Sequence, residues 1–146
     1  MLDDSVHTEI RLRLARLDHR YTPLRRVLVE AIAAAGRPVS IPEILASAPE
    51  LPQSSAYRNL SSLMESGVVR RVPGTDDHGR FELVEDLAGH HHHLVCARCG
   101  SVEDVRHSPA LEQALGEAAQ AVATEQGYCI TEHRFDLVGV CPACLP

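Results

Sequence analysis

The sequence of 146 residues contains no lysine and no tryptophan, and only 3% of its residues are aromatic. Aliphatic side chains must therefore fill its core, and every basic side chain other than histidine is a guanidinium group. No run of about 18 apolar residues is present, so we expect no transmembrane helix and no membrane partner. The first residues lack the basic and apolar regions of a secretory signal, which predicts a cytoplasmic protein. This length suits one medium domain or two small ones.

Charge is divided unevenly along the chain. The net charge is −6, but residues 1–84 contain eleven Arg against eleven Asp and Glu, whereas residues 85–146 contain three Arg against nine acids. Six of the nine His also lie in the second part. The second part is therefore suited to binding cations, while the first can contact phosphates locally without being basic overall.

Two Cys-x-x-Cys pairs lie far apart in the sequence, Cys96 with Cys99 and Cys141 with Cys144. In a reducing compartment such pairs are more often zinc ligands than disulfides. Four thiolates fill a tetrahedral zinc site and leave no open position, which predicts a structural zinc. Four buried thiols, or a redox dithiol, are the alternatives. The fifth cysteine, Cys129, is expected to be a small buried apolar residue.

Four consecutive histidines, residues 90–93, lead directly into the first cysteine pair. If this segment is extended, alternate side chains point in opposite directions, so His91 and His93 face one way and His90 and His92 the other. This predicts two separate metal sites that each need further ligands; a solvated polar loop is the alternative. The candidate further ligands are Glu82, Glu85, Asp104, Glu112 and His133.

The first part of the chain has the pattern of several helices followed by a β-hairpin. Apolar residues at helical spacing predict helices at residues 6–17, 24–35, 41–48 and 53–66. Thr22 before Pro23, and the capping box from Ser40 to Glu43, mark two helix starts. Two strands with a turn between them are expected at residues 68–72 and 80–84. This order is typical of a winged helix-turn-helix domain.

The helix expected at residues 53–66 has an exposed polar face that is a candidate for DNA contact. In helix-turn-helix proteins the second helix enters the major groove, and its first residues meet phosphate. Ser54 and Ser55 would contact phosphate, and the bases would be read by Tyr57, Arg58 and Asn59. Further arginines could contact the DNA backbone or minor groove, namely Arg20, Arg25, Arg70, Arg71 and Arg80. An ordinary solvated helix face is the alternative.

The second part of the chain has an α/β pattern. Residues 85–89 are polar and end in glycine, which is typical of a hinge. Strands are expected at residues 93–96 and 102–105, a helix at 110–126, and one or two strands within 128–140 with His133 on the last. The predicted fold class is α+β, with an N-terminal winged helix-turn-helix domain followed by a C-terminal α/β domain.

Taken together, these residues resemble the ferric uptake regulator family of bacterial metal-dependent repressors over nearly the whole chain. The resemblance is carried by the final cysteine pair and by residues 20–25, 55–60, 80–83 and 90–100. It implies a winged-helix DNA-binding domain at 1–84, a hinge at 85–90 and a dimerisation domain at 91–146. It also implies a homodimer that binds an inverted-repeat operator in double-stranded DNA when loaded with metal. Tyr21 joins the expected DNA contacts.

The resemblance also implies ligands for three metal sites. The four cysteines of the two pairs match the structural zinc site. A regulatory site beside the hinge is matched by Glu82, His91, His93 and Asp104. An additional site in the dimerisation domain is matched by His90, His92, Glu112 and His133. Many relatives add a histidine from the DNA-binding domain, but residues 36–39 here read Gly-Arg-Pro-Val. Glu85 is the first candidate to replace it, and the others are Asp76, Asp77, His78 and His19.

The regulatory ligands are imidazoles and carboxylates without a thiolate, which favours Fe(II), with Mn(II) and Zn(II) as alternatives. A peroxide-sensing variant, in which bound iron oxidises a ligand histidine, is a further alternative. Two functions of other classes, a zinc hydrolase and a metal buffer, fit the sequence less well. A zinc hydrolase needs an open metal position and a general base, but no His-Glu-x-x-His motif is present. A metal buffer would not need the winged-helix part.

Overall fold

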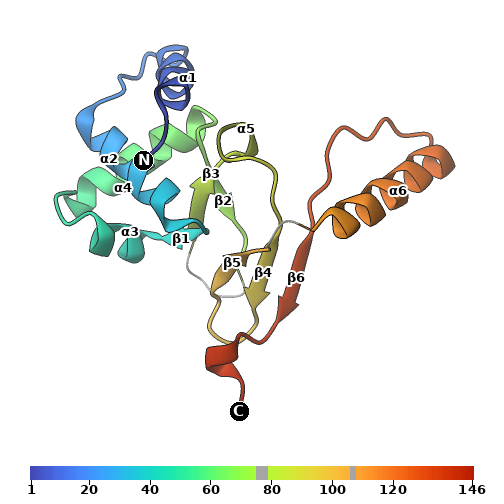
Figure 1. Cartoon of the computed structure of the whole chain (residues 1–146). Helices are drawn as coiled ribbons and strands as arrows, with labels where there is room; N and C mark the ends of the chain where they lie inside the picture. The colour runs from blue at the N-terminus through green and yellow to red at the C-terminus, as the bar shows by residue number, and fades with distance from the viewer. Residues whose placement is uncertain (75–78, 106–107) are drawn as a thin grey trace.

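The structure is a computed structural model that describes residues 1–74, 79–105 and 108–146. Among these residues it has two three-stranded sheets, and Figure 1 shows them side by side in the middle of the molecule. Helices gather over the first sheet, and a long helix drawn in orange projects from the opposite side (Figure 1). The predicted α+β fold class is confirmed, with helices and a β-hairpin in the N-terminal part and a sheet with a long helix in the C-terminal part.

The N-terminal part follows the expected order of helices and hairpin. Its elements are α1 (Asp4–Ala15), α2 (Pro23–Ala35), β1 (Val39–Ser40), α3 (Ile41–Ser47), α4 (Gln53–Glu65), β2 (Val69–Val72) and β3 (Arg80–Leu83). Thr22 caps α2 by accepting from the Arg25 backbone N–H, and Gly36 ends that helix in a left-handed conformation. The helix α1 starts earlier than expected, because the Asp3 side chain accepts the backbone N–H groups of Ser5 and Val6.

One apolar core holds this part together. The first sheet has the order β1-β3-β2, and both of its strand pairs are antiparallel. Helices α1, α2 and α4 cover it with Leu14, Leu28, Ile32 and Leu63, and β3 adds Leu83, all of them almost fully buried. Burying each such aliphatic side chain contributes roughly 1.5–3 kcal/mol. The core therefore fixes which face of α4 is buried and which face stays free.

The C-terminal part is a small mixed sheet with a long helix beside it. Its elements are α5 (Glu85–Ala88), β4 (His93–Cys96), β5 (Val102–Asp104), α6 (Pro109–Gln126), β6 (Asp136–Gly139) and the short 3-10 helix η1 (Pro142–Cys144). The strand order is β5-β4-β6, with β5 antiparallel and β6 parallel to β4. The expected hinge contains the one-turn helix α5. His133 lies in the loop before β6 and not on a strand, which corrects the prediction.

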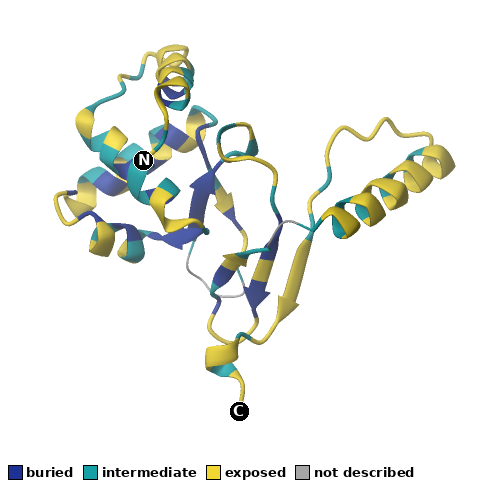
Figure 2. Cartoon of the chain, viewed as in Figure 1, coloured by how far each residue is buried: buried dark blue, intermediate teal, exposed yellow. Residues whose placement is uncertain are grey.

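Helix α6 and strand β6 have little cover from the rest of the chain. Figure 2 shows both mainly exposed, and α6 contains no buried residue although it is 18 residues long. Large apolar side chains are exposed here, including Val122, Tyr128, Leu137 and Val138. Cys129 is also exposed, so the prediction that it is buried is wrong. None of the described helices is both long and apolar enough to span a membrane.

Candidate metal centres and DNA-contacting surface

Among the residues that the structure describes, three groups of four potential metal ligands come together in the folded chain. Within each group, the ligand atoms all lie within 4.8 Å of one another. The cysteine cluster consists of Cys96, Cys99, Cys141 and Cys144. The regulatory cluster consists of Glu82, His91, His93 and Asp104. The additional cluster consists of His90, His92, Glu112 and His133. The alternation along the four histidines thus places His91 and His93 in one cluster and His90 and His92 in another.

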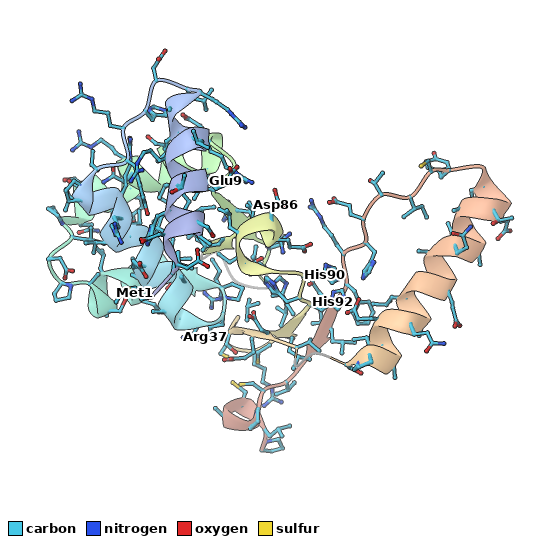
Figure 3. All side chains as sticks on the ribbon, turned by 45° about the horizontal axis from the view of Figure 1, so that its top comes forward. Met1, Glu9, Arg37, Asp86, His90 and His92 are labelled. Atoms are coloured by element: carbon cyan, nitrogen blue, oxygen red, sulfur yellow. The ribbon has the colours of Figure 1, made fainter. Side chains whose placement is uncertain are left out.

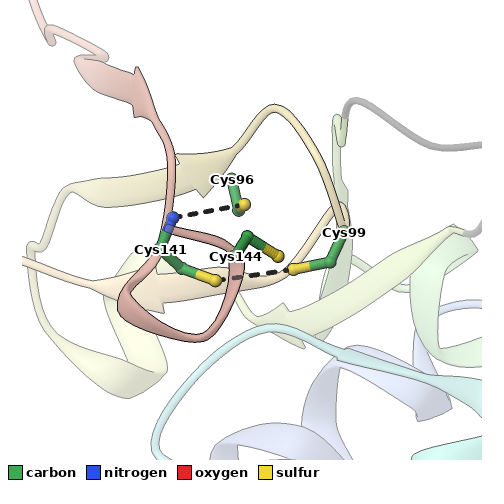
Figure 4. Close-up of side chains that lie close together, drawn as sticks. All are labelled: Cys96, Cys99, Cys141 and Cys144. Carbon is green, nitrogen blue, oxygen red and sulfur yellow. Dashed lines mark hydrogen bonds between the residues drawn. The ribbon is translucent and has the colours of Figure 1, made fainter. Parts of the chain in front are cut away.

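The cysteine cluster forms where β6 runs parallel to β4 (Figure 4). Cys96 ends β4, and Cys141 and Cys144 lie at and within the turn that follows β6. The sulfurs of Cys99 and Cys141 are 3.7 Å apart, and the Cys141 backbone N–H donates to the Cys96 sulfur. Zinc–sulfur bonds of about 2.3 Å in a tetrahedron place two sulfurs about 3.8 Å apart. The spacing therefore fits a closed zinc site.

The pKa values of the cysteine thiols also indicate that the cluster is suited to a cation. Backbone N–H groups of Cys99 and Cys141 donate to the Cys96 sulfur and lower its pKa to about 6. The neighbouring thiols of Cys141 and Cys99 raise the pKa of Cys144 to about 12. Four adjacent sulfurs thus cannot all become thiolates without a cation among them, and zinc supplies that charge.

The regulatory cluster joins the two sheets. Glu82 comes from β3, while His93 and Asp104 are paired across β4 and β5. Glu82 Oε2 lies 2.9 Å from His91 Nε2 and 3.0 Å from His93 Nε2. The other ring nitrogens face elsewhere, His91 Nδ1 toward the Gly89 carbonyl and His93 Nδ1 toward Asp136 Oδ1. With Nδ1–H donated to these oxygens, both Nε2 atoms would bind a metal once it replaces the Nε2 protons that face Glu82.

Electrostatics within the regulatory cluster fit a divalent cation. Burial opposes ionisation of Glu82, but hydrogen bonds from His93, His91 and Arg70 outweigh it and lower its pKa to about 2. Burial raises the pKa of Asp104, and its buried Oδ1 atom has no hydrogen-bond partner. A buried carboxylate oxygen without a partner is costly in a native fold. A cation at this point would satisfy it, so the four residues fit a metal site.

The additional cluster lies where α6 begins. His90 Nε2 is 3.1 Å from His133 Nε2, and each of these nitrogens is 3.5 Å from Glu112 Oε2. His92 Nε2 is 2.8 Å from Glu112 Oε1, yet this buried nitrogen makes no hydrogen bond of acceptable geometry. Figure 3 shows His90 and His92 on the segment that leads from α5 into β4. Three imidazole nitrogens and a carboxylate that converge on one point are suited to a shared metal.

Two of the other proposed regulatory ligands, Glu85 and His19, lie outside the regulatory cluster. Glu85 is not part of the regulatory cluster, because its two oxygens face Arg70 and His90. His19 lies 3.6 Å from Glu65 in the N-terminal part, away from the three clusters. Asp76, Asp77 and His78 lie outside the described residues. Arg37, in the segment 36–39 that follows α2, pairs with Glu43.

Asp136 is a further neighbour of the regulatory cluster that the sequence alone did not indicate. It starts β6 and stands directly beside His93 in the parallel pairing of β4 with β6. It holds the His93 ring by its Nδ1 atom at 3.1 Å. A carboxylate in this position orients a metal-binding histidine and raises its basicity. Nothing in the sequence indicates the partner, because 43 residues separate the two.

The free face of α4 is the candidate DNA-contacting surface. Ser54, Tyr57 and Arg58 are exposed there, while Ser55 and Asn59 are partly buried. The Arg25 guanidinium donates to Asn59 Oδ1 at 3.2 Å and to the Arg20 carbonyl, which ties the start of α2 to α4. The expected arginines Arg20 and Arg71 are exposed near this face of the fold.

Three of the residues expected to contact DNA have other partners. Arg80 is 8% exposed and donates to the Gly100 carbonyl at 2.6 Å, so the prediction that it contacts DNA is wrong. Arg70 donates to Glu82 at 2.6 Å and to Glu85 at 3.3 Å, which directs it toward the metal clusters. The Tyr21 hydroxyl lies 2.8 Å from His7 Nδ1 and is partly buried. These contacts arise from tertiary packing and have no signature in the local sequence.

Comparisons with known proteins agree with this geometry. The sequence profile described as the Ferric uptake regulator family matches residues 16–138. The peroxide operon regulator of Bacillus subtilis (strain 168) is 29% identical over 129 residues, which cover 86% of this chain and 83% of that protein. The Helicobacter pylori ferric uptake regulator, whose structure is described as revealing three functional metal binding sites, superposes with a TM-score of 0.73 at 20% identity. This match covers 97% of this chain and 92% of that one.

A zinc-bound manganese uptake regulator is also similar in structure. It has a TM-score of 0.65 at 27% identity, and the match covers 92% of this chain and 97% of that one. Relatives that respond to different signals therefore share this fold, so the sensed metal does not follow from similarity alone. A family profile that matches most of the sequence does settle the class of protein. The chain belongs to the ferric uptake regulator family, whose members are dimeric DNA-binding transcriptional regulators and not enzymes.

Proposed function

We propose that this protein is a metal-dependent repressor, which binds an inverted-repeat operator as a homodimer when Fe(II) occupies its regulatory cluster. The observation that carries this proposal is the position of that cluster between the two sheets. Glu82 belongs to the strand β3 of the winged-helix part, whereas His91, His93 and Asp104 belong to the C-terminal part. A ligand set divided in this way responds to how the two parts are oriented.

A metal in the regulatory cluster would bind ligands from both parts and thereby hold the two parts together. Glu82 brings β3, and with β3 the hairpin and α4, to a fixed position beside β4. Metal binding shifts the equilibrium between orientations of the two parts only to the extent that the metal affinity differs between those orientations. A coupling of about 1–3 kcal/mol changes DNA affinity by roughly 5–150-fold. That range is sufficient for a transcriptional switch.

The exposed apolar surface of α6 and β6 supports the homodimer. Val138 of β6 is 65% exposed and Val122 of α6 is 50% exposed, and both lie on elements with little cover within the chain. Large apolar side chains left exposed on such elements favour an interaction site. In a homodimer with two-fold symmetry the same surface meets itself, so one patch on each copy is enough.

Two copies of α4 would then present two recognition surfaces. Ser54 at the start of the helix would contact phosphate, and Tyr57 and Arg58, which are exposed, would contact bases in the major groove. Two-fold symmetry in the protein requires an operator with two inverted half-sites. Because the partner is chromosomal DNA, a cytoplasmic location is part of this proposal.

The four cysteines are proposed to hold a structural zinc. They connect the end of β4 with the segment after β6, and thereby fix the strand on which Asp136 stands. A site with four thiolates has no open position and serves stability rather than sensing. The zinc is therefore expected to remain bound while the regulatory metal is exchanged.

Fe(II) is proposed as the sensed metal because the regulatory ligands are two imidazoles and two carboxylates. Mn(II) and Zn(II) bind the same donors, and affinity alone would favour zinc. A peroxide-sensing regulator is the second candidate, since a relative at 29% identity is named a peroxide operon regulator. In that case peroxide would abolish DNA binding of the Fe(II) form and leave the Mn(II) form active.

The test is a titration of DNA binding under anaerobic conditions. The protein with its structural zinc is mixed with the DNA upstream of its own gene, and fluorescence anisotropy follows binding as Fe(II), Mn(II) or Zn(II) is added. We expect the affinity for this DNA to rise at least about fivefold with Fe(II). Binding that is equally tight with a chelator present would contradict the proposal.

A further inference from the structure

Arg70 connects the regulatory cluster to a residue outside it. Its Nε atom donates to Glu82 Oε1 at 2.6 Å, and its Nη2 atom donates to Glu85 Oε1 at 3.3 Å. Glu82 uses its other oxygen, Oε2, for His91 and His93. The guanidinium thereby fixes which oxygen of Glu82 faces the metal position. A planar fork with several donors can hold two carboxylates in this way, whereas an ammonium group cannot do so with the same geometry.

Glu85 continues the connection into the additional cluster. Its Oε1 atom accepts from Arg70, and its Oε2 atom lies 3.0 Å from His90 Nδ1. His90 Nε2 in turn faces Glu112 and His133. A carboxylate at Nδ1 keeps the proton on that nitrogen and leaves Nε2 as the metal-binding atom. Glu85 therefore orients a ligand of the additional cluster while it contacts the arginine of the regulatory cluster.

From these contacts we propose that Arg70 and Glu85 are positioning residues that link the two histidine clusters through one chain of hydrogen bonds and make metal binding at one cluster assist binding at the other. The chain runs from Glu82 through Arg70 and Glu85 to His90. This inference rests on the proposed metal sites, and it assigns Arg70 and Glu85 roles other than DNA contact and direct metal binding.

The direction of the coupling follows from side-chain freedom. The Arg70 side chain is 25% exposed and that of Glu85 is 26% exposed, so neither is held by packing alone. Fixing such side chains costs conformational entropy. The first metal to bind orders the Arg70 and Glu85 side chains, and its binding free energy includes this loss of entropy. The second metal then binds ligands that are already ordered. Binding at the two clusters is therefore positively cooperative.

The link also joins three structural elements. Arg70 lies on β2 of the hairpin, Glu85 on the helix α5, and His90 on the segment that enters β4. Asp86 lies on the same short helix, but its side chain is 72% exposed and contacts Arg13 instead. Asp86 is therefore a matched control, because it is a carboxylate on the same helix that lies outside the chain of contacts.

The experiment measures Co(II) binding to each cluster separately, in the full-length protein that retains its structural zinc. His91→Ala removes the regulatory cluster and leaves the additional one; His133→Ala does the reverse. Co(II) is titrated against a chromophoric chelator in both backgrounds, with zinc content and circular dichroism as checks on the fold. In the His91→Ala background, Glu85→Gln should weaken Co(II) binding by about 10–100-fold. Asp86→Asn should leave it unchanged.

Arg70→Gln should weaken Co(II) binding in both backgrounds, because Arg70 contacts Glu82 as well as Glu85. In the parent protein, the total free energy of binding two Co(II) should be more favourable than the sum of the free energies measured in the two single-cluster backgrounds. Arg70→Gln should remove this difference. A Glu85→Gln effect confined to the His133→Ala background would overturn the inference, because Glu85 would then be a regulatory ligand. If the free energy of binding two Co(II) to the parent equals the sum from the two single-cluster backgrounds, the proposed coupling is wrong. A parent that binds no Co(II) beyond the zinc site would instead refute the proposed function itself.

Discussion

Glu82 of β3 and His93 of β4 lie in different sheets, yet their Oε2 and Nε2 atoms are 3.0 Å apart and each residue is 5% exposed. This contact is the point at which the winged-helix part and the C-terminal part share ligands. Burial excludes water from it, so the pair depends on the surrounding charges for its stability. The regulatory role proposed for this protein depends on this junction.

The first prediction concerns the structural zinc. Cys144→Ser should release zinc, because the remaining three thiolates no longer complete the tetrahedral site. The free energy of unfolding should fall by more than about 4 kcal/mol, as expected when a structural metal is lost. Metal analysis and thermal unfolding measure both effects. Cys129→Ser is the control, since Cys129 is exposed and distant from the cluster, and it should change neither. Full zinc content in Cys144→Ser would contradict the assignment.

A second prediction concerns the DNA-contacting face of α4. Arg58→Ala should weaken operator binding by about 1–3 kcal/mol, because an exposed arginine that reaches a base or phosphate is lost. Metal stoichiometry should stay the same. Arg134→Ala, an exposed arginine of the C-terminal part, serves as the control in the same anisotropy assay. If Arg58→Ala binds the operator as tightly as the parent, α4 does not contact the DNA in the way proposed.

The third prediction tests the interface between copies. Val138→Asp places a charge on the exposed strand β6, and a charge buried without a partner in an interface is costly. The dimer should dissociate into monomers, which light scattering after size-exclusion chromatography detects. Leu12→Asp alters an apolar residue on α1 that is also exposed, at 51%, and should leave the dimer intact. A dimeric Val138→Asp variant would show that β6 lies outside the interface.

A fourth prediction concerns pH and the capping box of α3. Burial opposes ionisation of Glu43, but hydrogen bonds from the Ser40 backbone and side chain and from Arg37 lower its pKa from 4.5 to about 2. Because the folded pKa lies below the unfolded one, Glu43 stabilises the fold above about pH 4.5 and loses this contribution as the pH falls toward 2. Its side chain is 39% exposed, so solvent screening keeps the effect small.

Glu43→Gln should therefore lower the free energy of unfolding at pH 7 by about 1 kcal/mol, a usual value for a lost helix cap. The difference between variant and parent should shrink at pH 3.5. Denaturant unfolding of both proteins at each pH provides the measurement, so that zinc loss in acid affects both equally. A difference that is as large at pH 3.5 as at pH 7 would contradict the ionic role of Glu43.

Much of the fold could be predicted because its signals are local. Thr22 and the Ser40–Glu43 box mark helix starts through contacts within a few residues, and the structure retains both. The division of the four histidines follows from the period of an extended chain and needs no tertiary information. These features depend on neighbours in the sequence, which is why sequence reasoning found them.

The remaining features depend on contacts between distant segments. Asp136 reaches His93 only because β6 lies parallel to β4, and that pairing has no signature in either strand. Arg80 is buried because the hairpin packs against the Gly100 carbonyl, which contradicts its expected place on the DNA surface. Glu85 lies outside the regulatory cluster for the same reason, because Arg70 and His90 contact it from different elements. Tertiary contacts of this kind outweighed the local pattern.

The most direct test of the regulatory role compares His91→Ala with His19→Ala in metal-dependent DNA binding. His91 belongs to the regulatory cluster, whereas His19 lies in the N-terminal part beside Glu65. Both variants should remain folded dimers that retain zinc. The anisotropy titration with Fe(II) should show a rise in operator affinity for the parent and for His19→Ala, and none for His91→Ala. An undiminished rise with Fe(II) in the His91→Ala protein would contradict the central claim that this cluster controls DNA binding.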